Sequence, residues 1–282
     1  MPFDARKATN YLRGRFKDPP GLCCESIGGE LKKFEKTFWL MNDNTLAVVA
    51  LDRLHETALR EKIRAKLGTF TVFGHDAFRN HGWVDPFIHR DIYYLEPLKT
   101  QGCYRYDDST KTFGPRLECE GGMTGIIHEE WDGSTYGDEK NYLDLSASKA
   151  LSWHKQYEKT RSTTDKRMRD SFITFIEPMW KPTNLGFGKP DKDGKMTTYY
   201  LAAYLLVGEK SGWPEPFDSD RRKVVRTMLN SLQLGNGGFA TWYKVQNGKV
   251  VAKDQGGNTE TTSLAVYANI QPQEYCDFSL PA

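Results

Sequence analysis

The stretch that decides the fold is Thr259-Glu-Thr-Thr-Ser-Leu-Ala-Val-Tyr-Ala268, a polar opening followed by a uniformly apolar helix. An earlier stretch, Thr197-Thr-Tyr-Tyr-Leu-Ala-Ala-Tyr-Leu-Leu206, has the same character. Each stretch follows an amphipathic helical segment, a Gly-Phe pair and a polar loop, so that Phe187 and Phe239 mark a repeat of about 50 residues. Such a period is typical of helical hairpins that stack into solenoids or closed rings.

Two further segments open in the same way, Asn42-Asp-Asn-Thr45 and Asn141-Tyr-Leu-Asp144. A helix that is apolar on all sides is surrounded by other helices. The four openings therefore predict an inner layer of helices, with charged outer helices at 165–177 and 219–234. Because inner and outer helices alternate and run antiparallel, we expect the four polar openings at one end of a shared cavity.

Local signals predict the remaining helices and one hairpin. A single helix of about six turns is expected over 44–67, with Gly68 as its left-handed stop. Asn247-Gly248 between alternating residues predicts a hairpin over 239–253. A helix that begins at 141 has one apolar side, formed by Leu143, Ala147, Ala150, Leu151 and His154.

Residues 69–131 differ in character, because short aromatic or β-branched segments alternate there with Gly, Pro and Asp. We expect a turn at Asp107-Asp-Ser109, flanked by Cys103 and Cys119, which are interpreted as ordinary thiols, with a disulfide as the alternative in an oxidising compartment. The chain is thus expected to be a single domain, 1–282, with a strand- and loop-rich insertion at 69–131. The strands of the insertion are expected at 69–73, 92–95, 103–106 and 116–119.

Gln233-Leu-Gly-Asn-Gly-Gly-Phe239, followed by Trp242, resembles the repeat endings of α/α-toroid proteins. This broad group includes terpenoid cyclases, protein prenyltransferase β-subunits and six-hairpin glycosidases, and the likeness covers 141–270. It implies a mainly α fold, a partial or closed ring of helical hairpins, here with a β-rich insertion and a C-terminal β-hairpin. The terpenoid acid and metal motifs do not occur, since Asp107-Asp108 lacks a third carboxylate.

The composition limits the classes of partner. With 39 basic and 37 acidic residues the net charge is only +2, so we expect neither nucleic acid nor a membrane surface as partner. No apolar run is long enough to span a bilayer, and Met1-Pro-Phe-Asp-Ala-Arg lacks the core of a secretion signal, so a soluble, cytoplasmic protein is expected. The 7 Trp and 14 Tyr suit either a large core or a groove that stacks rings against a polar ligand such as an oligosaccharide.

Carboxylates at the helix openings are the candidate catalytic residues: Asp43, Asp144 and Glu260, with Glu130 from the loop Glu129-Glu-Trp-Asp132 as a further candidate. Glycoside hydrolysis requires two carboxyl groups, one protonated and one ionised, and partial burial can separate their pKa values. The competing interpretation of Asp43 and Glu260 is helix capping. Asp144 lies one turn inside its expected helix, where it cannot act as N-cap.

Aromatic residues near these openings are the candidate stacking platforms for a sugar ring, with packing of loops as the alternative. The candidates are Trp39, Trp131, Tyr136, Tyr199 and Trp242, together with Trp180 and Tyr243. The residues predict no metal and no cofactor, because His75, His81 and His89 have no regular ligand spacing. The resulting hypothesis is a carbohydrate-active hydrolase or lyase. The alternatives are a non-catalytic module that binds a peptide, glycan or protein, and an isoprenoid cyclase or transferase.

Overall fold

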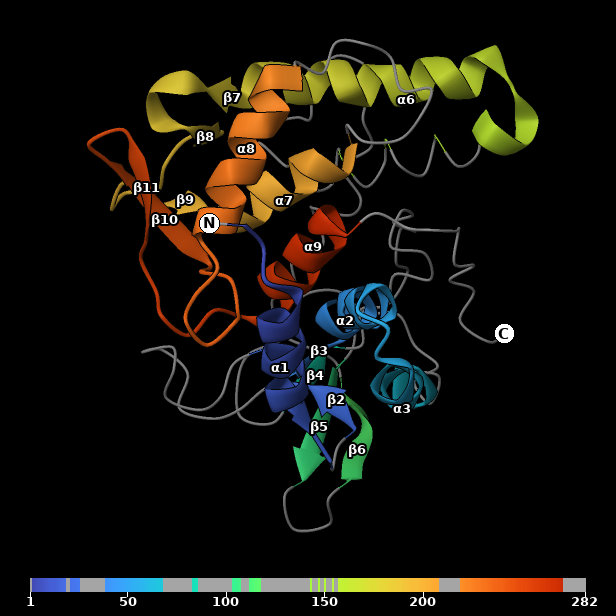
Figure 1. Cartoon of the computed structure of the whole chain (residues 1–282). Helices are drawn as coiled ribbons and strands as arrows, with labels where there is room; N and C mark the ends of the chain where they lie inside the picture. Colours follow the sequence, from blue (N-terminus) through green and yellow to red (C-terminus); the bar gives the residue numbers. More distant parts are fainter. Residues whose placement is uncertain are drawn as a thin grey trace.

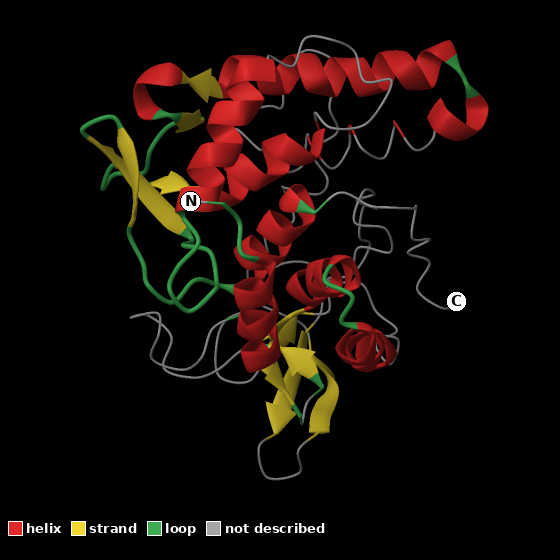
Figure 2. Ribbon diagram, viewed as in Figure 1, coloured by secondary structure: helices red, strands yellow, loops and turns green. Residues whose placement is uncertain are grey.

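The computed structural model describes residues 2–18, 21–25, 39–67, 83–85, 103–107, 112–117, 143, 147, 150, 154, 157–207 and 219–270. These residues form a helix-rich fold with small sheets (Figures 1 and 2). The helices are α1 (Ala5–Arg15), α2 (Met41–Arg53), α3 (Thr57–Leu67), α6 (Thr163–Ile176), α7 (Thr198–Val207), α8 (Ser219–Ser231) and α9 (Thr259–Asn269), with the 3-10 helices η1 (Glu177–Met179) and η2 (Pro182–Asn184). The strands are β1 (Phe16–Lys17), β2 (Leu22–Cys23), β3 (Trp39–Leu40), β4 (Trp83–Asp85), β5 (Cys103–Asp107), β6 (Thr112–Leu117), β7 (Trp180–Lys181), β8 (Gly186–Phe187), β9 (Met196–Thr197), β10 (Trp242–Gln246) and β11 (Lys249–Ala252).

Helix α9 lies at the centre of the described fold, between α7 on one side and α1 and α2 on the other (Figure 1). Thr259 and every residue from Thr261 to Ala268 are buried, which confirms the prediction of an inner helix. Helix α2 is its main neighbour and is buried from Asp43 to Leu51. Both helices contribute side chains to two hydrophobic clusters, so they form the seam that joins the two halves of the core.

The single helix predicted over 44–67 is wrong, because the chain turns between α2 and α3. His55 takes the left-handed conformation, with φ of 58°. The N–H of His55 donates to the carbonyl of Asp52 and that of Glu56 to the carbonyl of Leu51, at 3.0 and 2.8 Å, which is the hydrogen-bond pattern of a Schellman motif. The side chains of Arg60 and Asp52 also form an ion pair across the turn. Sequence analysis placed the stop at Gly68 because glycine is the usual residue in this conformation.

The two C-terminal repeats have the predicted elements. Helix α6 precedes β8 and α7, whereas α8 precedes Phe239 and α9, and both Phe187 and Phe239 are buried. The predicted hairpin is β10–β11, with positive φ at Asn247 and Gly248 as a two-residue type I′ turn requires. Strand β9 pairs with β10 and completes a three-stranded sheet.

The helix predicted from 141 is described at only a few positions. Leu143, Ala147, Ala150 and His154 are helical and buried, which confirms one buried face. Leu151 lies outside the described residues.

The insertion strands β4, β5 and β6 form one sheet with β3, which precedes α2. The β3–β4 pair is parallel and the others are antiparallel. The strand predicted at 103–106 is confirmed as β5. The strand predicted at 116–119 begins earlier, at Thr112, which pairs with Asp107. The segments 69–73 and 92–95, and Cys119, lie outside the described residues.

Helix α1, which the sequence analysis did not predict, packs against the Gly-Gly pair that ends the second repeat. Gly237 has φ of +95°, and a Cβ there would lie 2.1 Å from the carbonyl oxygen of Lys7. A Cβ on Gly238 would lie 2.5 Å from the ring of Tyr11. Gln233 joins the same two segments, because its side chain exchanges two hydrogen bonds with the backbone of Asp4, at 2.8 and 2.9 Å. The glycines of this motif are therefore required for close approach of α1.

The structure thus confirms a helix-rich fold with small sheets, whereas ring closure and the single-domain organisation stay predictions. In the described part of the chain, no helix has both the length and the apolar character needed to cross a bilayer.

Candidate functional site

The openings of α2 and α9 meet at one buried side chain, Glu25, which lies two residues after the end of β2. Its Oε2 accepts hydrogen bonds from the backbone N–H groups of Thr259 and Glu260, at 3.1 and 3.2 Å. The first amides of a helix lack partners within the helix and carry its positive partial charge. Glu25, only 6% exposed, therefore supplies from outside the helix the hydrogen-bond acceptor that the first amides of α9 lack.

The carboxyl group of Glu25 also forms a hydrogen bond with Asp43, which lies fully buried in the first turn of α2. Burial raises the pKa of Glu25, and the hydrogen bonds from Asp43 and from the amides of Glu260 and Thr259 act in the opposite direction. A hydrogen bond between two carboxyl groups requires a proton, and two such groups in contact do not both ionise readily. Glu25 and Asp43 therefore form a buried pair of carboxyl groups, in which the raised pKa of Glu25 favours its protonated form.

Arg15 is the cation whose charge acts on Glu25. It is 3% exposed, and its positive charge lowers the pKa of Glu25. Its Nη2 donates to the carbonyl oxygens of Gly256 and Gly257, at 3.1 and 3.3 Å, and its guanidinium lies 4.7 Å from the ring centroid of Tyr11. Arg15 thus binds the loop that leads into α9 and places a buried positive charge near Glu25.

The segment Cys23–Glu25 is itself fixed by polar contacts with both helices. Asn44 of α2 exchanges two hydrogen bonds with the backbone of Cys23, at 2.7 and 2.9 Å. The hydroxyl of Thr259 donates to the carbonyl of Cys24 at 2.5 Å. Burial raises the pKa of the Cys23 thiol, so Cys23 is a neutral, structural thiol at physiological pH.

The opening of α7 is connected to that of α9 through residues 239–241. The N–H of Phe239 donates to the hydroxyl of Thr262, and the N–H of Thr198 donates to the carbonyl of Thr241, both at 3.0 Å. Three of the four predicted openings, those of α2, α7 and α9, are therefore linked by short hydrogen-bonded segments. The fourth, at Asp144, lies outside the described residues.

Two of the four predicted catalytic residues are thus brought together through Glu25. Asp43 touches Glu25 through its side chain, and half-buried Glu260 does so through its backbone. Neither is an N-cap: α9 is capped by Asn258, whose Oδ1 accepts from the N–H of Thr261 at 2.8 Å. Asp144 and Glu130 lie outside the described residues.

No sequence pattern marks Glu25. It follows the Cys23-Cys24 pair in a segment without periodicity, and its partners in α9 are more than 230 positions away along the chain. Only its isolation as a charged residue directly after a short apolar stretch could have drawn attention to it.

The described aromatic candidates divide by exposure. Trp39 belongs to the buried core, which favours the alternative of packing over a stacking platform, and Tyr199 is half-buried against the core. Trp180 lies 5.1 Å from the ring of Phe187, and the hydroxyl of buried Tyr243 donates to the carbonyl of Leu185 at 2.9 Å. Trp131 and Tyr136 lie outside the described residues. Trp242, 38% exposed, therefore remains the aromatic candidate with a ring that a ligand can reach in the part of the chain described.

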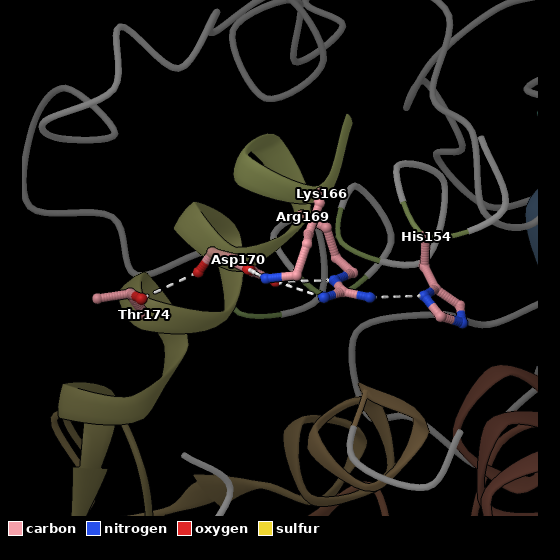
Figure 3. A network of polar contacts seen from close by, with 5 residues as sticks. All are labelled: His154, Lys166, Arg169, Asp170 and Thr174. Atoms are coloured by element: carbon pink, nitrogen blue, oxygen red, sulfur yellow. Dashed lines mark hydrogen bonds and ion pairs between the residues drawn. The ribbon is translucent and has the colours of Figure 1, made fainter. Parts of the chain in front are cut away.

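A second buried polar network joins α6 to the helical residue His154 (Figure 3). The Nη1 of fully buried Arg169 lies 3.1 Å from Nδ1 of His154, while Asp170 accepts from both Arg169 and Lys166, at 2.8 and 2.9 Å. Because a guanidinium can only donate, Nδ1 of His154 must accept, which leaves its proton on Nε2, 3.3 Å from Glu158. The network fixes one tautomer of His154.

A cavity of about 420 Å³ lies elsewhere, between the start of α1 and the end of α8. Its polar lining includes Asp4, Lys7, Asn230 and Gln233. It contains none of the carboxyl groups described above. Among the residues that the structure describes, no three potential metal ligands cluster together.

Comparison with protein-family models, with curated proteins and with solved structures gives no match to this chain.

Proposed function

We propose that the chain is a carbohydrate-active hydrolase or lyase that uses Glu260 as one of its carboxylates. The observation that supports this is the convergence of Glu25, Asp43 and Glu260 where the helices α2 and α9 open. Glu260 is the member of the three that is only half-buried, so it is the one that a substrate can reach.

The three carboxyl groups have different roles in this proposal. A glycosidase separates its two carboxyls by about 5 Å or more, because the scissile bond lies between them. Glu25 and Asp43 share a hydrogen bond and leave no such space. They are therefore positioning residues: Glu25 holds the backbone of Glu260, and Asp43 holds Glu25. Asp144 and Glu130 are the proposed partners of Glu260, from the sequence alone.

The test is turnover by the full chain across a panel of neutral and acidic polysaccharides. New reducing ends report hydrolysis, and the ultraviolet absorbance of an unsaturated product reports a lyase. Glu260→Gln keeps the size of the side chain but removes its basicity, so activity should fall by about 10²- to 10⁴-fold. Asp220→Asn, on a side chain 85% exposed at the start of α8, is the matched control. Full activity in Glu260→Gln, or no turnover of any substrate by the wild type, would refute the proposal.

A non-catalytic carbohydrate-binding module is the second candidate. It is favoured by the contrast between the enclosed Glu25–Asp43 pair and the exposed ring of Trp242. In that case saccharides raise the melting temperature by mass action while no substrate is turned over, and Trp242→Ala removes the shift.

A further inference from the structure

The outer face of the β10–β11 hairpin is aromatic and cationic. In the antiparallel register Tyr243 pairs with Ala252, and these side chains face the core. Lys244 pairs with Val251 on the opposite side of the sheet. We call this opposite side the lysine face. By alternation it is formed by Trp242, Lys244, Gln246, Lys249, Val251 and Lys253, with Gln246 directly opposite Lys249.

The apolar and polar members of this face are both accessible. Trp242 is 38% and Val251 36% exposed, and Lys249 and Lys253 are also exposed. Lys253 lies beside Trp242, because its N–H donates to the carbonyl of Trp242 at 2.9 Å. A cation and a large ring therefore stand next to each other at one end of the face, with Lys249 at the other.

The positive charge of this face is only weakly compensated by the described residues. Lys249 and Lys253 take part in no described ion pair. The nearest acid in sequence, Asp254, accepts from the backbone N–H groups of Trp242 and Gly257, both at 3.0 Å. Asp191 accepts a hydrogen bond from the backbone N–H of Lys195, which is the main cause of its lowered pKa. Lys244 lowers the pKa of Asp191 further through its charge. Both carboxylates are thus held within their own turns, and the charge of Asp191 acts on Lys244.

Strand geometry sets the spacing of the charges. Alternate residues on one strand lie about 7 Å apart, and directly paired residues about 5 Å apart. The lysines therefore form a row along the hairpin, with Trp242 at its end. A ligand that matches this face is an extended polymer with regularly spaced anionic groups and rings that stack.

We propose that the lysine face binds an acidic polysaccharide, with Trp242 stacked on a sugar ring and the lysines contacting uronate carboxylates. This inference deepens the proposed function and rests on it, because it names the class of substrate. A single-stranded nucleic acid would also supply anions and rings, but such proteins stack successive bases on several aromatic side chains. The described lysine face has a single aromatic side chain, Trp242, so a saccharide is the better match.

The experiment measures binding of polygalacturonate to the full chain by calorimetry, with neutral dextran of similar length and a single-stranded homopolymeric DNA as comparisons. Polygalacturonate should bind at least tenfold more tightly than either, and its affinity should decrease as the salt concentration rises. Dextran or DNA binding as tightly as polygalacturonate, or no binding of polygalacturonate, would overturn the inference.

Variants then locate the site. The double variant Lys249→Ala/Lys253→Ala and the single variant Trp242→Ala should each raise the Kd by about tenfold. Thermal unfolding of the double variant should be unchanged, because both lysine side chains are exposed. Lys62→Ala/Lys223→Ala removes the same charge from side chains that are 62% and 78% exposed elsewhere, and should leave the Kd unchanged. An equal effect of the two double variants would show general electrostatic attraction and contradict the proposed site. Because binding is measured without turnover, a polymer that binds here but is not cleaved refutes only the enzyme proposal.

Discussion

Removal of the Glu25 side chain should detach the start of α9 from the N-terminal segment. Glu25→Ala leaves the amides of Thr259 and Glu260 without their acceptor, at positions where the chain encloses them. It also leaves Asp43 buried without its carboxyl partner, and Arg15 without the nearby anion. Glu25→Gln, in contrast, keeps an acceptor oxygen for the two amides and gains an amide donor for Asp43.

The two variants should therefore differ strongly in stability. Each buried group that loses its partner costs about 1–3 kcal/mol. Removal of one member of a buried polar pair costs about 3–5 kcal/mol in total. Glu25→Ala should thus reduce the free energy of unfolding by about 3–5 kcal/mol and the melting temperature by about 10 °C. Glu25→Gln should change it by about 1 kcal/mol or less.

The Glu25–Asp43 pair also predicts the direction in which stability changes with pH. Because burial raises the pKa of Glu25 above its ordinary 4.5, the folded chain keeps a proton that the unfolded chain releases. The contribution of this group to stability is complete below pH 4.5 and decreases as the pH rises through the raised pKa. Glu25→Gln has no proton to release there, so its stability should fall less than that of the wild type between pH 4.5 and neutrality.

Thermal and urea unfolding followed by circular dichroism across this pH range measures both effects. Glu61→Ala, on a side chain that is 50% exposed, serves as the control and should change stability by less than about 1 kcal/mol. If Glu25→Ala unfolds with the same midpoint as Glu61→Ala, the buried pair does not hold α9. If Glu25→Gln has the same pH profile as the wild type, the proton is not held by Glu25.

Two further predictions concern the packing of α1 and of β2. Gly238→Ala would place a methyl group against the Tyr11 ring and should lower the free energy of unfolding by about 1–3 kcal/mol. Gly14→Ala, with no atom within 4 Å of its Cβ, is the control and should not lower it. Equal midpoints of thermal unfolding for the two variants would contradict the close approach. The fully buried Cys23 should resist maleimide in the native chain and react after unfolding, as mapped by mass spectrometry, and rapid native labelling would show that burial does not protect it.

Sequence patterns predicted those parts of the fold that depend on local chemistry. The uniformly apolar run of α9 and the Asn247-Gly248 turn have few alternative conformations, and both predictions are confirmed. The break at His55 was not predicted, because a non-glycine residue takes the left-handed conformation there. The turn is closed by the hydrogen bonds of His55 and Glu56, and α2 and α3 contact each other on its two sides.

The residues of the candidate site could likewise be predicted only in part. Asp43 and Glu260 could be selected because they open predicted inner helices. Glu25 could not, because its importance arises only when distant segments meet. Likewise Trp39 and Trp242 are indistinguishable as sequence signals, yet one is 5% and the other 38% exposed. Burial of a single ring depends on the whole packing around it, so it had to come from the structure.

The bond between Glu25 and the first amides of α9 also has a consequence for synthesis of the chain. Glu25, near the beginning of the chain, cannot bind the amides of Thr259 and Glu260 until the last described helix has left the ribosome. Contacts of such long sequence separation slow folding, since a large loop must close before they form. We therefore expect the core to form late during synthesis. Until α9 has been synthesised, the apolar side chains of α2 lack their main packing partner.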